Sequence, residues 1–326
     1  MRRTLDALGR QTLPPTLIVV VDDGSTDDTP RILAEYRTRL PNMRVVRREN
    51  RGARAVGPGV IEAFYAGLAT VNLDEFDFVC KIDLDLDLPD RYFEILITRM
   101  EDDPRLGTCS GKPYYPHPRT GRLVSEGCGD ENSVGMTKLY RVECFRQIGG
   151  FVPQVMWDGI DNHRCRMLGW KAASWDDPEL RFTHLRPMGS SQKGILHGRM
   201  RHGFGQYFMG TDPLYMVASA VFRMAMPPYV VGGTTMLWGY LKAALDQSPR
   251  YGDEAFRSFL RRYQHQALVR GKRAATKALD DSWQARAVPD GSRPSGPMRP
   301  STVAPIPLDE ARPHPPAGPG ARRTSS

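Results

Sequence analysis

A short apolar run followed at once by a group of acidic residues constrains the fold of this chain most strongly. Residues 17–21 read LIVVV, and residues 22–30 read DDGSTDDTP. A continuous β-branched run of this length is typical of a parallel strand that is buried on both faces. Thr29 is suited to cap a following helix, and Pro30 is suited to its first position. The pattern therefore predicts a strand, an acidic loop and a helix over 31–40.

Strand and helix signals continue to alternate after this point. The remaining predicted elements of the front half are strands at 43–48 and 77–85 and helices at 2–12, 61–71, 88–103 and 141–151. In the first helix, Leu5, Leu8 and Leu13 would lie on one side. Short links between alternating elements indicate a doubly wound α/β sheet, in which ligands bind beyond the carboxyl ends of the strands.

Two groups of aspartates stand at such strand ends. Asp22 and Asp23 could accept hydrogen bonds from a base or a ribose, although an acidic loop also forms Asx turns without any ligand. Asp83 and Asp85 would point to the same side of an extended chain. Two close carboxylates repel each other unless a cation intervenes, and hard oxygen ligands suit Mg²⁺ or Mn²⁺. The alternative for this pair is an exposed acidic edge.

A third acidic group, WDGID at 157–161, lies beside a predicted helix at 160–170. A carboxylate there could take a proton from a nucleophilic hydroxyl. Asp158 or Asp161 could instead cap the helix. Three such groups on one α/β pattern are more specific than any one of them alone.

Charge divides the chain into unlike parts. The net charge is +8, but residues 1–180 hold 24 basic and 28 acidic residues, whereas residues 181–270 hold 12 and 4. An acidic front half does not suit a nucleic-acid platform, so we expect no nucleic-acid partner. The basic middle could face anionic lipid or a phosphorylated substrate, or could be an ordinary solvated surface.

Residues 224–241 carry no charge and just reach the length of a membrane-spanning helix. Two prolines at 227–228 and two glycines at 232–233 interrupt the stretch, which favours an interfacial or re-entrant element over a span. From about residue 285 the chain is rich in Pro, Gly, Ser and Arg, which predicts a disordered tail. The N-terminus has no secretory signal and the five cysteines form no CxxC pair, which favours a reducing, cytoplasmic location.

Three segments together resemble a family 2 glycosyltransferase of the GT-A fold, of the kind found in bacterial polysaccharide and exopolysaccharide synthesis. They are QTLPPTLIVVVDDGSTDDTPRIL, KIDLDLDLPDRYFE, and FRQIGGF followed by WDGIDNHRCRMLGW, and the resemblance runs over about residues 2–185. It implies a mostly parallel sheet flanked by helices and a divalent metal. It also implies transfer of a sugar, with inversion, from a nucleoside-diphosphate donor to a saccharide or lipid-linked acceptor.

The resemblance also implies roles for individual residues. On the donor side these are Asp22, Asp23 and Arg54 for the nucleotide, Asp83 for the ribose or diphosphate, and Asp85 and His184 for the metal. On the acceptor side Asp158 is the implied catalytic base. Trp157 stands where the family usually has Glu, so Asp161 remains an alternative base.

Two departures from the family pattern bear on function. Members normally begin with a strand such as VSVVIP, whereas this sequence starts inside the helix that follows that strand. The QxxRW signature of processive synthases is absent from GRMRHGFGQY at 198–207, which favours addition of single sugars. The alternatives are a polyprenyl-phosphate glycosyltransferase or a catalytically silent nucleotide-binding scaffold.

We therefore expect a catalytic domain over 1–186, a basic helical extension over 187–284 and a tail over 285–326. The extension is expected to meet an anionic membrane surface, which would make the protein peripheral at the inner face of the plasma membrane.

Overall fold

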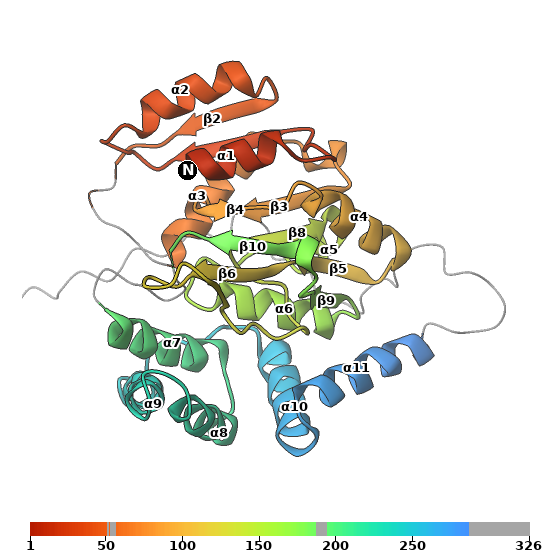
Figure 1. The fold of residues 1–326 in the computed structure, drawn as a ribbon. Helices are drawn as coiled ribbons and strands as arrows, with labels where there is room; N and C mark the ends of the chain where they lie inside the picture. The colour runs from red at the N-terminus through yellow and green to blue at the C-terminus, as the bar shows by residue number, and fades with distance from the viewer. Residues whose placement is uncertain (51, 53–56, 187–193, 287–326) are drawn as a thin grey trace, which may run out of the picture.

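Strands and helices alternate along the front of the chain and build sheets flanked by helices (Figure 1). The computed structural model describes residues 1–286 apart from 51, 53–56 and 187–193. The described strands are β1 (Ile18–Asp22), β2 (Met43–Arg47), β3 (Phe78–Ile82), β4 (Leu86–Asp87), β5 (Leu106–Ser110), β6 (Lys112–Pro116), β7 (Leu123–Ser125), β8 (Thr137–Arg141), β9 (Lys171–Ser174) and β10 (Arg181–His184). The described helices are α1 (Arg2–Gly9), α2 (Thr29–Arg39), α3 (Pro58–Leu68), α4 (Tyr92–Asp102), α5 (Val142–Gln147), α6 (Trp157–Met167), α7 (Ile195–Met209), α8 (Pro213–Met224), α9 (Val231–Leu245), α10 (Glu254–Arg270) and α11 (Lys272–Arg286), with the 3₁₀ turns η1 (Leu73–Glu75) and η2 (Pro178–Leu180). The predicted α/β class is confirmed.

The strands fall into three sheets with mixed pairing. β1 pairs in parallel with β2, and the other sheets have the orders β4-β10-β6-β7 and β3-β8-β5-β9. β10 is parallel to β6 and antiparallel to β4, whereas β8 lies antiparallel between β3 and β5. An antiparallel neighbour needs no crossover helix, and the chain passes from β7 to β8 without one. The pairing is therefore more mixed than the mostly parallel sheet expected from the sequence.

The first parallel pair stands apart from the other sheets. Among the described strands β1 hydrogen-bonds β2 alone, in a register that places Val20 opposite Val45. Leu5 and Leu8 of α1 are buried in the same core as Val20, whereas Leu13 follows the end of α1 and is 41% exposed. β1 and β3 therefore belong to different sheets.

Two helices beside predicted site residues begin at other positions than expected. Asp28, not Thr29, is the N-cap of α2, and the Thr29 N–H donates to Asp27 Oδ1 at 3.0 Å. Helix α6 begins at Trp157 instead of residue 160, directly after Met156, whose φ is 70°. A left-handed φ is unusual for a residue with a long side chain. The turn at Met156 places Asp158 inside the first turn of α6.

Helices α7, α8 and α9 pack together below the α/β body in Figure 1. Met236 and Tyr240 lie in the centre of this bundle, and a Cβ on Gly203 would lie only 1.9 Å from the Met236 carbonyl oxygen. Helices α10 and α11 return to the body, where Trp283 Nε1 donates to the Arg166 carbonyl at 3.1 Å. Of the tail predicted from residue 285, only 285 and 286 are described, and they end α11.

The uncharged stretch 224–241 consists of the last residue of α8, a connection and most of α9. Helix α8 ends at Met224, residues 225–230 form a connection, and α9 begins at Val231. Within the part of the chain that the structure describes, no helix combines the length and the apolar character needed to cross a bilayer.

Candidate active site

The loop after β1 folds onto the loop after β2. Gly24 has a φ of 79°, and a Cβ there would lie 2.4 Å from backbone atoms of Asn50. Asn50 Nδ2 in turn donates to the Gly24 carbonyl at 2.9 Å. Only glycine combines this left-handed backbone with so close a contact. The carboxyl ends of the two parallel strands are thereby held together where the nucleoside is expected. Arg54, the other residue assigned to the nucleotide, lies outside the described residues.

Asp22 and Asp23 differ in how their carboxylates are held. Asp22 is buried, and its Oδ1 accepts a hydrogen bond from the Ser25 N–H at 2.8 Å, while its Oδ2 lies 3.8 Å from Arg47 Nε. Asp23 is exposed, and its Oδ1 lies 2.8 Å from Arg48 Nη1. The buried Asp22 carboxylate therefore stabilises the loop by a local hydrogen bond, which was the alternative to ligand binding. Asp23 faces outward, where a ligand could meet it.

A buried lysine connects the second acidic group to the third. Lys81 Nζ lies 2.5 Å from Asp83 Oδ1 and 2.9 Å from the Gly135 carbonyl oxygen. A Cβ on Gly135 would lie 2.8 Å from Asp158 Oδ2, so the Asp158 carboxylate packs directly on this glycine. Asp83, through Lys81, and Asp158 are therefore both linked to Gly135, although they are far apart in the sequence.

The pairing of β4 with β10 brings Asp85 to a histidine. Leu86 is opposite His184 in this pair, and the Leu185 N–H donates to the Asp85 carbonyl at 2.9 Å. Asp85 Oδ2 lies 3.8 Å from His184 Nε2 and accepts hydrogen bonds from Arg186 Nε and Nη2 at 2.8 and 2.6 Å. The structure thus brings together the two residues that the resemblance assigned to the metal, with Arg186 beside them.

Glu126 completes this group, although we did not identify it from the sequence. Its Oε1 lies 3.1 Å from His184 Nδ1, and its side chain is 4% exposed. Burial lowers the pKa of His184, but the hydrogen bond and charge of Glu126, with the charges of Asp85 and Asp83, outweigh burial and raise that pKa above its ordinary value. The only sequence signal for Glu126 is an isolated carboxylate in a glycine-rich segment.

The residues around Asp85 fit a divalent cation that the phosphates of a bound substrate would also hold. Within the described ranges, no three His, Cys, Asp or Glu side chains form a cluster suited to a metal. Mg²⁺, however, is often bound by one or two protein carboxylates together with substrate phosphates. Asp85 offers an oxygen and His184 a ring nitrogen, while Glu126 holds the opposite ring nitrogen. Such a carboxylate commonly orients a metal-binding imidazole.

The Asp158 carboxylate is open to a reacting group. Asp158 lies in the first turn of α6 and is half-buried. Its carbonyl accepts hydrogen bonds from Lys138 Nζ at 3.2 Å and from Asn162 Nδ2 at 2.7 Å. No donor from the described residues reaches its carboxylate, so those oxygens could accept a proton from a bound hydroxyl.

Asp161, one turn further along α6, has a different environment. It is buried, its two oxygens lie 2.6 and 2.5 Å from Lys138 Nζ, and the Tyr140 hydroxyl donates to Oδ2 at 2.5 Å. Burial raises the pKa of Asp161 to about 6 in spite of the Lys138 charge. A buried carboxylate with both oxygens occupied cannot reach an acceptor, so the geometry favours Asp158 for the base.

Trp157, which stands where the family usually has Glu, lies between two buried lysines. Its ring centroid is 5.1 Å from Lys81 Nζ and 5.5 Å from Lys138 Nζ, distances suited to cation–π attraction. Phe151 packs on it edge-on, with centroids 4.8 Å apart. The indole therefore supports the lysines that pair with Asp83 and Asp161.

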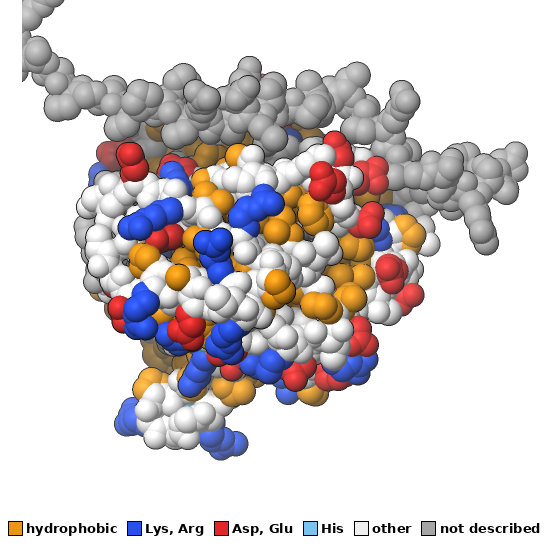
Figure 2. Space-filling model, turned by 90° about the horizontal axis from the view of Figure 1, so that it is seen from above, with side chains coloured by type: hydrophobic (Ala, Val, Ile, Leu, Met, Phe, Trp, Pro, Cys, Tyr) orange, Lys and Arg blue, Asp and Glu red, His pale blue; other side chains and the backbone are white. Residues whose placement is uncertain are grey.

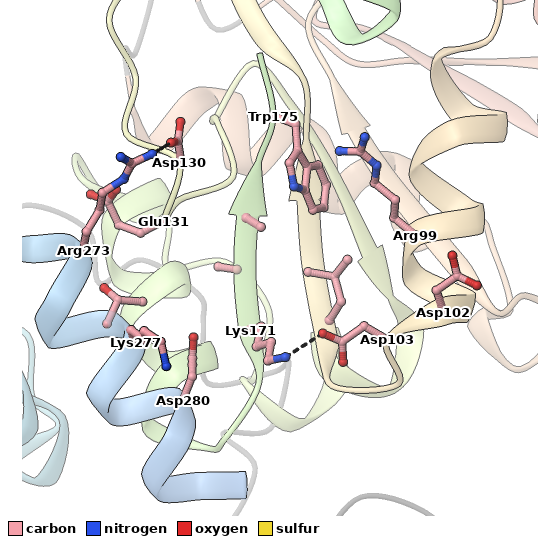
Figure 3. A pocket seen from close by; sticks show the side chains of 14 residues that line it. Arg99, Asp102, Asp103, Asp130, Glu131, Lys171, Trp175, Arg273, Lys277 and Asp280 are labelled. Carbon is pink, nitrogen blue, oxygen red and sulfur yellow. Dashed lines mark hydrogen bonds and ion pairs between the residues drawn. The ribbon is translucent and has the colours of Figure 1, made fainter. Parts of the chain in front are cut away.

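Two cavities in the described structure lie away from these residues. One, of about 570 Å³, lies between β9 and α11, and Trp175 lines it (Figure 3). Its charged side chains largely pair with one another: Lys171 with Asp103 at 2.7 Å, and Arg273 with Asp130. The other, of about 810 Å³, lies between α10 and α11. No predicted site residue lines either cavity, so neither enters the proposed chemistry.

Comparison with known proteins finds similarity to glycosyltransferases. The family described as "Glycosyl transferase family 2" matches residues 1–154. The "Putative glycosyltransferase EpsH" of Bacillus subtilis (strain 168) is 30% identical over 110 residues, which are 34% of this chain and 29% of that protein. The chain thus spans less than a third of that relative. A solved mannosyltransferase, PcManGT from Pyrobaculum calidifontis in complex with GDP-Man and Mn²⁺, is 20% identical with a TM-score of 0.44, over 87% of this chain and 82% of that one.

The family match includes the two donor-side groups, Asp22/Asp23 and Asp83/Asp85, and also the positioning residue Glu126. Asp158 and His184 follow the matched segment, and the contacts described above join them to it. The similarity to glycosyl transferase family 2 thus covers residues 1–154, slightly less than half of the chain.

Proposed function

We propose that this protein is a metal-dependent, inverting glycosyltransferase that moves one sugar from a nucleoside-diphosphate sugar to a hydroxyl of a saccharide or lipid-linked acceptor. One observation supports this most: short contacts connect acidic residues that are far apart in the sequence. Lys81 bonds both Asp83 and the Gly135 carbonyl, and Asp158 packs on Gly135. Asp85 faces His184, whose pKa the charges of both Asp85 and Asp83 raise.

On the donor side, the loop after β1 would receive the nucleoside, with Asp23 exposed to it and Asp22 holding the loop. Asp83 would meet the ribose or diphosphate, and Asp85 with His184 would hold Mg²⁺ or Mn²⁺. A bound cation would offset the charge of the departing diphosphate. Arg186 now occupies Asp85 Oδ2 and would turn from it to the diphosphate when the donor binds.

On the acceptor side, Asp158 would take the proton of the attacking hydroxyl. The freed oxygen would form the new bond to the anomeric carbon while the bond to the diphosphate breaks on the opposite face. The electron pair of that bond leaves with the diphosphate, so the configuration at carbon inverts. Asp161, Lys138 and Tyr140 would hold the first turn of α6 and thereby aim Asp158.

We further propose that residues 1–186 form the catalytic domain and 187–284 a basic extension. A role in cell-surface polysaccharide synthesis, at the cytoplasmic face of the plasma membrane, fits the sequence resemblance to bacterial polysaccharide glycosyltransferases and a lipid-linked acceptor. The basic middle of the chain and the uncharged stretch 224–241 leave polyprenyl phosphate as a second candidate acceptor.

The two acceptors differ in their need for a base. A phosphate oxygen is already ionised near neutral pH, whereas a sugar hydroxyl must lose its proton during attack. Replacement of Asp158 by Asn would therefore abolish transfer to a hydroxyl but largely spare transfer to polyprenyl phosphate. This difference separates the candidates even before the natural acceptor is known.

The proposal is tested by incubating the full chain with a panel of nucleoside-diphosphate sugars, with Mn²⁺ or with chelator, against saccharide-lipid acceptors and polyprenyl phosphate. We expect metal-dependent transfer of one sugar, lost in Asp85→Ala and retained in Glu179→Ala, which changes an exposed carboxylate. A protein that binds a donor but neither transfers nor hydrolyses its sugar in any combination would instead be a nucleotide-binding scaffold.

A further inference from the structure

Helix α8 turns an apolar face outward. Leu214, Val217 and Val221 are three and four residues apart and therefore share one side of the helix. Their exposed fractions are 64%, 46% and 60%, and the neighbouring Phe222 is 65% exposed. Met216, on the opposite side, is fully buried. The outward side of α8 thus presents large apolar groups to solvent.

Helix α9 repeats this arrangement. Val231, Trp238 and Leu245 are seven residues apart, lie on one side of the helix, and are 48%, 54% and 75% exposed. The connection at 225–230 is also apolar, and its Tyr229 is 65% exposed. We call the outward sides of α8 and α9, with this connection, the hairpin face.

The apolar residues of the hairpin face are not exposed because the bundle is loosely packed. The inner side of α9 is closely covered: a Cβ on Gly239 would lie 2.1 Å from the Met200 carbonyl oxygen of α7, and one on Gly233 would lie 2.3 Å from the Ala220 carbonyl oxygen of α8. Within the described structure, α7 and α8 have thus already filled the side that α9 can bury. The exposed side needs a different partner.

The charges beside the hairpin face are mostly basic. Residues 213–245 contain Arg223 and Lys242 and no acidic residue, and the adjoining Asp246 pairs with Lys242 at 2.6 Å. Helix α10, which contacts α8, exposes Arg261 and Arg262, whereas its exposed Glu254 lies 3.3 Å from Arg257. By contrast, the surface on the α2 side of the molecule mixes acidic and basic side chains (Figure 2). A second copy docked through the hairpin face would bring like charges together, whereas an anionic surface would complement them.

We propose that the hairpin face docks on an anionic phospholipid bilayer, with its apolar side chains among the acyl chains and the α10 arginines at the headgroups. Apolar burial combined with a few basic residues is the usual basis of peripheral binding. The inference goes beyond sugar transfer and does not depend on it. Because Gly205 of α7 packs against Met156, directly before α6, docking would hold the acceptor side of the candidate site near the bilayer.

The test is flotation of the full chain with vesicles of phosphatidylglycerol and phosphatidylcholine, compared with phosphatidylcholine alone, with no donor present. We expect binding to the anionic vesicles only. Each basic contact contributes about 1 kcal/mol, roughly fivefold in partitioning. Arg261→Glu/Arg262→Glu should therefore reduce partitioning at least roughly tenfold, and Phe222→Ser/Trp238→Ser should reduce it comparably.

Controls change an exposed apolar residue and an exposed arginine elsewhere: Leu123→Ser on the exposed strand β7, and Arg37→Glu on α2. Both should float like the unaltered chain, and circular dichroism should show all variants folded. Failure of the unaltered chain to float, equal flotation with neutral vesicles, or equal loss in the controls would overturn the proposal. So would a stable dimer that Phe222→Ser/Trp238→Ser dissociates, since a second copy would then cover the face.

Discussion

The imidazole of His184 is held at Nδ1 by Glu126, whose Oε1 lies 3.1 Å away, while Nε2 faces Asp85 Oδ2 at 3.8 Å. An ionised carboxylate can only accept a hydrogen bond, so Nδ1 carries the proton that it donates to Glu126. In the neutral ring, Nε2 then presents its lone pair toward Asp85. Glu126 therefore fixes both the orientation and the tautomer that a metal-binding histidine needs.

Replacement of Glu126 should weaken metal binding more than it destabilises the fold. We expect Glu126→Ala to reduce the affinity for Mn²⁺ about 10- to 100-fold in the presence of a nucleoside diphosphate, as seen when such supporting groups are removed elsewhere. Titration followed by the electron paramagnetic resonance of free Mn²⁺ measures this directly. Glu179→Ala is the control, and equal affinities in the two variants would show that Glu126 does not act on the metal.

Asp158 and Asp161 should respond differently to the same substitution. Asp158→Asn removes the proton acceptor, so we expect kcat for transfer to a hydroxyl to fall about 10²- to 10⁴-fold while donor affinity and the melting temperature stay unchanged. Asp161→Asn should lower the melting temperature, because it breaks the buried pair with Lys138. Steady-state kinetics and thermal unfolding of both variants distinguish them. The assignment fails if Asp158→Asn turns over normally.

The buried Lys138–Asp161 pair should be needed as a unit. Lys138→Met leaves the Asp161 carboxylate buried without its cation, which costs about 3–5 kcal/mol in comparable pairs. The double variant Lys138→Met/Asp161→Leu should recover much of this loss, because it removes both charges. Urea unfolding followed by tryptophan fluorescence measures the free energies of unfolding. Additive losses in the double variant would contradict a coupled pair.

Gly24 should tolerate no side chain. Gly24→Ala would force a positive φ on alanine and push its Cβ into the Asn50 backbone. Gly121 is the matched control, since its φ is 67° but nothing lies within 4 Å of a Cβ there. We expect Gly121→Ala to show backbone strain alone, about 1 kcal/mol, and Gly24→Ala to cost more and to weaken donor binding. Calorimetric titration with nucleoside diphosphates provides the second readout, and equal effects at both sites would exclude the close contact.

His202 of α7 should make the fold sensitive to acid. Burial, assisted by the charge of Arg223, lowers the pKa of His202 from 6.5 to about 4. Between these values the unfolded chain binds a proton that the folded chain does not, so the free energy of unfolding decreases as pH falls from 6.5 to 4. The loss is at most about 3 kcal/mol. His202→Gln should remove this part of the pH dependence in urea unfolding at pH 7 and pH 4.5. Identical losses in both proteins would exclude His202 as the source.

Much of the donor side could be predicted from the sequence. The LIVVV run and the turn chemistry of DDGSTDDTP are local signals, and they placed β1, the acidic loop and α2 to within one or two residues. The strand predicted over 77–85 ends earlier, at Ile82, so Asp83 follows β3 and Asp85 lies in the turn before β4 instead of in an extended chain. Helix α6 was predicted three residues too late, because the left-handed turn at Met156 has no sequence signature.

By itself, then, this sequence determined its α/β class, its local elements and the strand ends that carry acids, since hydrophobic periodicity and turn residues act over a few positions. Only the tertiary structure decided which side chains meet. Glu126 reaches His184 because its N–H bonds the Pro113 carbonyl of β6, the parallel neighbour of β10. The Asp158 carboxylate accepts no hydrogen bond from the described residues, whereas the Asp161 carboxylate, one turn further along α6, is buried against Lys138. Contacts of this kind depend on how distant segments pack, and no short window of sequence contains that information.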